Sequence, residues 1–204
     1  MTQPLHDLKE TPSQTAGPYV HIGCVPNRSG IAGVYPEDLG ARLITGPVDG
    51  QQITLTGVVH DGAGAPLKDA LLEIWQADAA GRFVAGDPRG PGDPHFTGWG
   101  RSASDGATGA YLFETVKPGR VPFRDGSLQA PHISLWIVAR GINLGLQTRI
   151  YFADEPAANA EDPILTRIEH QRRIPTLLAL PEGPDRYRFD VHLQGPQETI
   201  FFDF

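Results

Sequence analysis

Hydrophobic and polar residues alternate with a period of two along most of the chain after residue 50. In residues 53–59, Ile, Leu, Gly and Val alternate with Thr, Thr and Val, and residues 61–64 (Asp-Gly-Ala-Gly) then form a turn signal. This period places side chains on opposite faces of a β-strand. Strands are predicted at residues 53–59, 71–76, 111–115, 132–140, 147–152, 186–193 and 200–204, the last as an edge strand.

Helical patterns are short and few. Only residues 155–161 and 175–180 favour a helix, so the strand–helix alternation of a doubly wound parallel sheet is missing. The 24 glycines and 19 prolines are typical of many short strands joined by tight turns. We therefore expect an all-β fold, a single β-sandwich domain of mixed short strands with few short helices.

The first part of the chain differs from the rest. Residues 11–23 contain prolines and glycines that rule out a long helix, and turn residues dominate residues 27–50 without a sustained period. We expect an extended N-terminal arm over residues 1–50, followed by the β-sandwich domain over residues 51–204.

Composition narrows the possible partners and compartments. The formal net charge is −7 and the isoelectric point is near 5.4, so the basic footprint of a nucleic-acid or membrane-surface binder is missing. A single cysteine, Cys24, excludes an intramolecular disulfide and a four-cysteine zinc site. Residues 1–10 lack a signal-peptide pattern, and the chain has no apolar run of membrane-spanning length. We expect a cytoplasmic protein.

General catalytic motifs are missing from the sequence. It has no phosphate-binding Gly-rich loop, no His-Glu-x-x-His and no Gly-x-Ser-x-Gly. The seven histidines never stand two or four residues apart, the spacings that put two metal ligands on one face of a strand or helix. The residues alone therefore identify no activity.

Residues 70–83, Ala-Leu-Leu-Glu-Ile-Trp-Gln-Ala-Asp-Ala-Ala-Gly-Arg-Phe, resemble the E-x-W-Q-A-x-x-x-G-x-Y segment of intradiol ring-cleaving dioxygenases. Further matching segments lie, in the same order, at residues 11–19, 116–119, 131–133, 148–152 and 198–204. Each segment is weak by itself, but their order and spacing extend the resemblance over nearly the whole chain. The resemblance implies a β-sandwich core, in agreement with the period of two.

The resemblance implies an iron site: members of the family hold a ferric ion with two tyrosinates and two histidines. Hard phenolate oxygens of the tyrosinates suit Fe³⁺. The tyrosine positions match Phe83 and Val121 here, and the His-x-His pair matches His132 and Ser134. An arginine that precedes the histidine pair matches Gln129. Three of the four ligands are replaced, so we expect no metal ligands and no catalytic residues in this chain.

The replacement of these ligands resembles the pattern in the alpha, non-iron subunits of heteromeric members of the family. The resemblance then implies a homologous beta subunit that binds the Fe(3+), and a higher-order αβ hetero-oligomer. The complex would cleave protocatechuate with O2 in aromatic catabolism, and the isolated chain would be inactive. By residue match, this chain would contribute substrate-binding residues to a cleft between subunits: Thr15, Gly17, Pro18, Tyr19 and Arg140.

Simpler interpretations of these residues remain open. From the residues alone, Tyr19 suits an arm ring packed on the sandwich, and Arg140 suits a solvated strand end. Eight residues of strand separate Arg140 from His132 by roughly 26 Å, so the two are expected to serve different sites. Two alternatives to a substrate-binding alpha subunit also stay open. The chain could be a purely structural subunit, or a stand-alone intradiol dioxygenase with an unconventional site that recruits Tyr111 or Tyr151.

Overall fold

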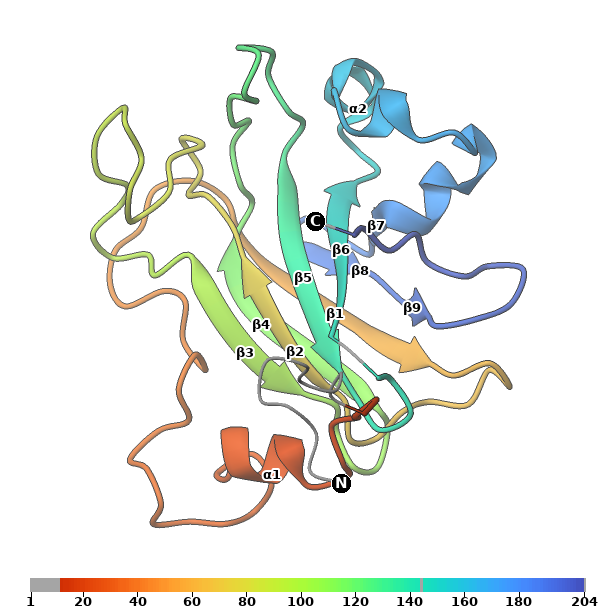
Figure 1. Ribbon diagram of the computed structural model, residues 1–204. Helices are drawn as coiled ribbons and strands as arrows, with labels where there is room; N and C mark the ends of the chain where they lie inside the picture. Colours follow the sequence, from red (N-terminus) through yellow and green to blue (C-terminus); the bar gives the residue numbers. More distant parts are fainter. Residues whose placement is uncertain (1–11, 144, 204) are drawn as a thin grey trace, which may run out of the picture.

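The computed structural model describes residues 12–143 and 145–203, and strands dominate this part of the chain (Figure 1). The strands are β1 (Gln52–His60), β2 (Leu71–Trp75), β3 (Trp99–Ala103), β4 (Ala110–Val116), β5 (His132–Val138), β6 (Leu146–Phe152), β7 (Leu178–Pro181), β8 (Arg186–Arg188) and β9 (Val191–His192). The helices are α1 (Val20–Cys24) and α2 (Pro156–Glu161), with two 3-10 helices, η1 (Leu165–Arg167) and η2 (Gln171–Leu177).

The strands form one sheet that folds over on itself. Their order is β3-β2-β5-β6-β7-β8-β1-β4, with β9 added to β1. The antiparallel group β3-β2-β5-β6 makes one layer and β8-β1-β4 makes the other, while the short β7 joins them. Three pairs, β1–β8, β1–β9 and β6–β7, are parallel. The all-β prediction is confirmed.

The core forms where the inward faces of the two layers meet. On β5, Ile133, Leu135 and Ile137 are buried, and on β1 Leu55 and Val59 are buried opposite them in the same cluster. The residues between them on β5 point outward and are only half-buried. The period of two in the sequence therefore predicts correctly which side chains fill the core.

Three predicted elements differ from the structure because tertiary contacts decide them. The predicted helix at residues 175–180 is instead the end of η2 followed by β7, which pairs with β6 and β8. The predicted strand at residues 186–193 divides into β8 and β9. Between them the Asp190 carboxylate, rather than a backbone carbonyl, accepts a hydrogen bond from the Val58 amide. Residues 200–203 contribute only a bridge between Phe202 and Gln147.

The sequence gives no signal for β3. Its Trp-Gly-Arg-Ser-Ala segment contains small residues that lower strand propensity. Gly100 is required there because a Cβ atom would lie 2.4 Å from Cδ1 of the buried Leu43. The strand itself forms by pairing with β2, and Gly100 lets it pack on a residue more than fifty positions away.

Part of the predicted arm packs on the outer face of the first layer. Residues Val20, Cys24 and Val25, in and just after α1, form a small cluster with Leu71, Ala103 and Val138. Residues 1–11 lie outside the described residues, and the boundary at residue 50 stays a prediction. No helix in the described ranges has the length and apolarity to cross a membrane.

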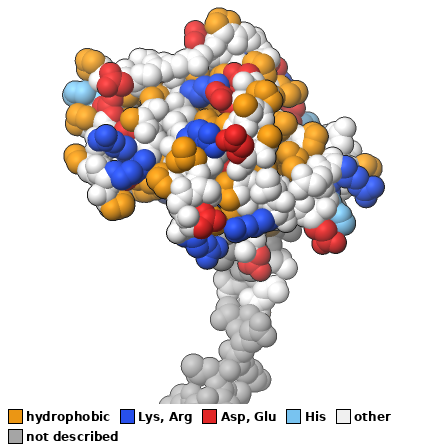
Figure 2. All heavy atoms as spheres, turned by 90° about the horizontal axis from the view of Figure 1, so that it is seen from above, with side chains coloured by type: hydrophobic (Ala, Val, Ile, Leu, Met, Phe, Trp, Pro, Cys, Tyr) orange, Lys and Arg blue, Asp and Glu red, His pale blue; other side chains and the backbone are white. Residues whose placement is uncertain are grey.

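The end of the molecule that carries the long loops has a mixed surface. Figure 2 shows Lys and Arg side chains interspersed with Asp and Glu over this face, with hydrophobic side chains between them. This face therefore presents no extended surface of a single charge sign.

A pair of leucine substitutions tests the layered core. Leu72 on β2 is fully buried, whereas Leu112 on β4 is 41% exposed. We expect Leu72→Ala to lower the free energy of unfolding by about 2–5 kcal/mol, because it leaves a cavity between the layers. Leu112→Ala should change it by no more than about 0.5 kcal/mol. Equal losses in urea unfolding would contradict the described burial.

Candidate functional site

The arm meets the sandwich at the end of β5. The Thr15 hydroxyl donates a hydrogen bond to the backbone oxygen of Ala139, at 3.2 Å, directly beside Arg140. Residues Gly17, Pro18 and Tyr19 follow in the turn that leads into α1, and the Tyr19 ring is 75% exposed. The structure thus brings Thr15 next to Arg140 and leaves the ring of Tyr19 accessible.

Arg140 is held from one side by a buried carboxylate. Its Nε atom lies 2.9 Å from Oδ2 of Asp69, whose side chain is only 9% exposed, while the Arg140 side chain is 61% exposed. The other carboxylate oxygen of Asp69 is buried and makes no hydrogen bond within the described ranges. Asp69 holds the Arg140 guanidinium at its Nε atom, and the exposed side chain remains accessible to an anionic ligand. The sequence gives no signal for Asp69, because only the fold brings it to Arg140.

The positions that match the family's iron ligands lie at the opposite end of β5 (Figure 1). The turn before Phe83 packs on the segment before Val121, since a Cβ atom on Gly81 would lie 2.1 Å from the Arg120 carbonyl oxygen. The Val121 carbonyl in turn accepts a hydrogen bond from the Gln129 amide. Arg140 and His132 therefore lie at opposite ends of the strand, and their assignment to different sites stays a prediction.

A hydrogen-bond network occupies that end of the outer sheet face. The Arg149 guanidinium donates to the Gln129 side-chain oxygen at 2.7 Å and to the Tyr151 hydroxyl at 3.4 Å. The Tyr151 hydroxyl donates to the Asp162 carboxylate at 3.4 Å. Asp162 is fully buried and also accepts hydrogen bonds from the backbone amides of Ala130, Ile164 and Leu165.

His132 lies beside this network as a buried neutral imidazole. Its Nδ1 is 2.8 Å from the Ala130 carbonyl oxygen, so Nδ1 is the protonated nitrogen. Burial, reinforced by the nearby Arg149 charge, lowers the pKa of His132 to about 4. Its ring stacks at a tilt on Tyr151, with 5.6 Å between the ring centroids.

The residues at this end do not fit a ferric ion. The phenol of Tyr151 has its pKa raised by burial, which is the opposite of what a tyrosinate ligand needs. Tyr111, the other candidate, donates its hydroxyl to the Phe189 carbonyl at 2.5 Å deep in the core, and burial raises its pKa as well. The Arg149 guanidinium lies near His132 and would repel a trivalent metal ion.

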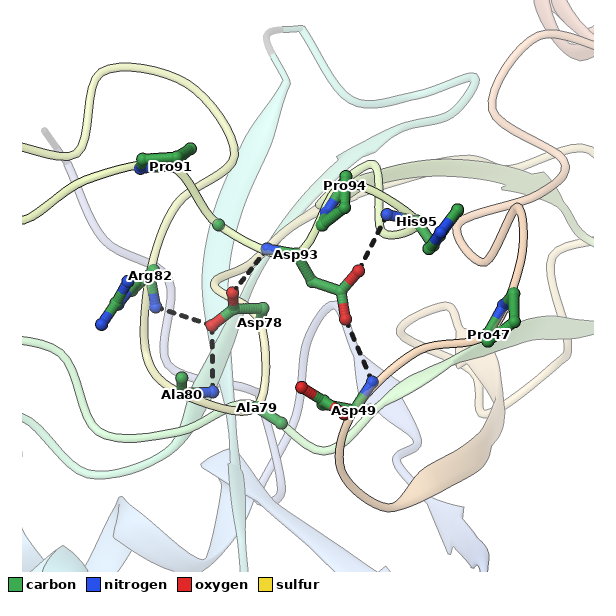
Figure 3. A pocket seen from close by; sticks show the side chains of 11 residues that line it. Pro47, Asp49, Asp78, Ala79, Ala80, Arg82, Pro91, Asp93, Pro94 and His95 are labelled. Carbon is green, nitrogen blue, oxygen red and sulfur yellow. Dashed lines mark hydrogen bonds between the residues drawn. The ribbon is translucent and has the colours of Figure 1, made fainter.

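A cleft of about 490 Å³ borders the loop that carries Phe83 (Figure 3). Asp78 accepts hydrogen bonds from the amides of Ala80, Arg82 and Asp93. Asp93 accepts from the amides of Asp49 and His95, and these bonds lower its pKa. The carboxylates therefore hold the loops in place. Among residues 12–143 and 145–203, no three His, Cys, Asp or Glu side chains are placed to share a metal ion.

His132 generates a pH prediction. The unfolded chain takes up a proton on this histidine below about pH 6.5, whereas the folded chain does so only near pH 4. The neutral form stabilises the fold fully above pH 6.5, and stability falls as the pH drops towards 4, by roughly 3 kcal/mol. We expect His132→Gln to remove this part of the pH dependence in urea unfolding measured from pH 7 to 4.

The control for that experiment is His170→Gln, which replaces an exposed histidine in the loop before η2. The stability of the wild type relative to His132→Gln should fall by roughly 3 kcal/mol between pH 7 and pH 4. Parallel curves over the whole range would contradict the description of His132 as a buried neutral group.

Comparison with known proteins places the chain in a family. The family model described as "Dioxygenase" matches residues 37–195. The "Protocatechuate 3,4-dioxygenase alpha chain" of Pseudomonas putida is 43% identical over 204 residues, covering 98% of this chain and 100% of the relative. The alpha chain of the same name from Burkholderia cepacia is 44% identical, covering 96% and 98%.

Another relative is named as the beta chain, rather than the alpha chain, of the same enzyme. The "Protocatechuate 3,4-dioxygenase beta chain" of Burkholderia cepacia is 34% identical over 160 residues, covering 74% of this chain and 67% of the relative. Alpha and beta chains are thus homologous to each other and to this chain. With the family model and the full-length relatives in agreement, the chain belongs to the intradiol dioxygenase family and is similar over its whole length to alpha subunits of such enzymes.

Proposed function

We propose that this chain is the non-iron alpha subunit of a protocatechuate 3,4-dioxygenase. The complex inserts both atoms of O2 between the two hydroxyl-bearing carbons of protocatechuate and releases 3-carboxy-cis,cis-muconate. The observation that carries the proposal is the full-length similarity to alpha chains, together with Phe83, Val121 and Ser134 at the positions of three ligands.

The iron belongs to the homologous beta subunit. A ferric ion needs anionic oxygen ligands, whereas His132 is a neutral imidazole here and the guanidinium cation of Arg149 lies opposite Ser134. The beta-chain relative is similar enough to share the fold, so it supplies the sheet face on which the ligands stand. This chain contributes substrate-binding residues to the beta subunit's site, across the interface between the two subunits.

The contribution of this chain is to bind and orient the substrate. Arg140 presents a permanent positive charge that pairs with the carboxylate of protocatechuate, and Asp69 restricts its motion. The hydrogen bond from Thr15 to Ala139 ties the arm beside Arg140. Gly17, Pro18 and the exposed ring of Tyr19 then form an adjoining wall of the cleft against the aromatic ring of the substrate.

Iron content tests the division between the subunits. We expect the chain produced alone to be colourless, free of stoichiometric iron and inactive. Mixed or co-produced with a beta chain, the complex should contain iron, show ferric–tyrosinate absorbance and cleave protocatechuate. Metal analysis and visible spectroscopy check both states. Stoichiometric iron with that absorbance in the lone chain would overturn the proposal in favour of a stand-alone enzyme.

Arg140→Ala tests the substrate contact in the assembled enzyme. Loss of a charge-assisted contact costs about 1.5–3 kcal/mol, so KM for protocatechuate should rise by about 10- to 150-fold while the iron content stays intact. Asp69→Asn should raise KM less, because the guanidinium remains but is held less firmly. Arg186→Ala, at an exposed arginine paired with Glu182 on the other layer, is the control. An unchanged KM in Arg140→Ala would favour a purely structural subunit.

A further inference from the structure

All three tryptophans of the chain line one groove on the outer face of the β3-β2-β5-β6 layer. The register explains why they meet. Trp75 on β2 lies directly opposite Trp99 on β3 and Ser134 on β5, and Glu73 lies opposite Trp136. Directly opposed residues share one face of a sheet. The groove has a volume of about 420 Å³.

The groove is apolar and its charges are paired. Glu73 and Arg101 form an ion pair at 2.7 Å, and the Arg101 guanidinium lies 5.1 Å from the centroid of the Trp99 ring. Trp75, on the second strand of the layer, is nevertheless 46% exposed. One exposed and two half-buried tryptophans, with neutralised charges around them, suit the apolar centre of a protein interface better than a small charged ligand.

Two small residues hold the groove in its shape. Ser134, a small residue, lines the groove directly opposite Trp75 on one side and Arg149 on the other. Gly145 allows the Trp136 indole to lie against the backbone, since a Cβ atom there would be 2.0 Å from the indole Nε1. The surface is therefore preformed, which limits the entropy lost when a partner binds.

The groove is continuous with the arm. One row below it on the same sheet face, Leu71, Ala103 and Val138 are covered by α1. At the edge of the layer, Gly40 packs against Trp99, next to Leu39, which is 59% exposed. The groove and the arm thus form one surface, and the arm already contributes the residues proposed to reach the partner's substrate cleft.

We propose that the tryptophan groove, lined by Trp75, Trp99 and Trp136, is the docking surface for the beta chain. This inference rests on the proposed function. The beta-chain relative is homologous to this chain, so the partner can offer its equivalent sheet face in a quasi-twofold contact. A second copy of this chain is the less favourable occupant, because each copy has a net charge of −7.

The test is the affinity of Trp75→Ala for a beta chain, measured by sedimentation of the full-length chains. Trp75 is half-exposed, so its truncation should leave the isolated fold intact, and thermal unfolding of the lone variant verifies this. We expect the dissociation constant to rise at least ~30-fold, the effect of a central interface residue. Leu180→Ala, at a 59% exposed leucine on β7, is the matched control and should change it less than threefold.

Photo-cross-linking gives a second measurement that does not depend on stability. A benzoylphenylalanine at position 75 should cross-link to the beta chain, whereas one at position 180 should not. An active complex with normal affinity in Trp75→Ala and no cross-link from position 75 would overturn the docking surface and leave the proposed function standing. Cross-linking between two copies of this chain without the beta chain would also overturn it. No complex and no activity with any beta chain would refute the proposed function itself.

Discussion

The antiparallel register of β5 between β2 and β6 is the constraint on which the rest of the structure depends. It directs Ile133, Leu135 and Ile137 into the core and sets His132, Ser134 and Trp136 in successive rows of the outer face. A shift by one residue would exchange the two sets. The core, the network at Arg149, the tryptophan groove and the anchoring of α1 are all consequences of this single alignment.

The outer face of the layer has a different chemistry at each level along β5. At the His132 end, the chain has a half-buried cation, Arg149, which donates hydrogen bonds to Gln129 and Tyr151. At the Arg140 end, a buried carboxylate holds an exposed cation, and the arm is tied beside it. Between these ends lie the tryptophans. The same strand thus connects a polar network at one end to an exposed, anchored cation at the other.

Much of the fold could be predicted from the sequence because its main strands bury one face each. Alternation at residues 53–59 and 132–140 predicts β1 and β5 and their core residues. It fails where local pattern and tertiary contacts disagree. The segment at 175–180 contains good helix formers, yet pairing with β6 and β8 makes part of it a strand. The small residues of β3 carry no strand pattern, and pairing with β2 makes the segment a strand.

The sequence by itself determined the all-β class and the identity of the buried faces, because residue type and spacing carry that information directly. The expectation that Phe83, Val121 and Ser134 replace iron ligands comes from the family resemblance. Only the tertiary structure decided which distant residues meet. It brought Asp69 to Arg140, Thr15 to Ala139, and Gln129 and Asp162 into the network around Arg149 and Tyr151. It also gathered three tryptophans from three strands into one groove. Such contacts depend on strand register and loop packing, which are properties of the whole chain and leave no local pattern in the sequence.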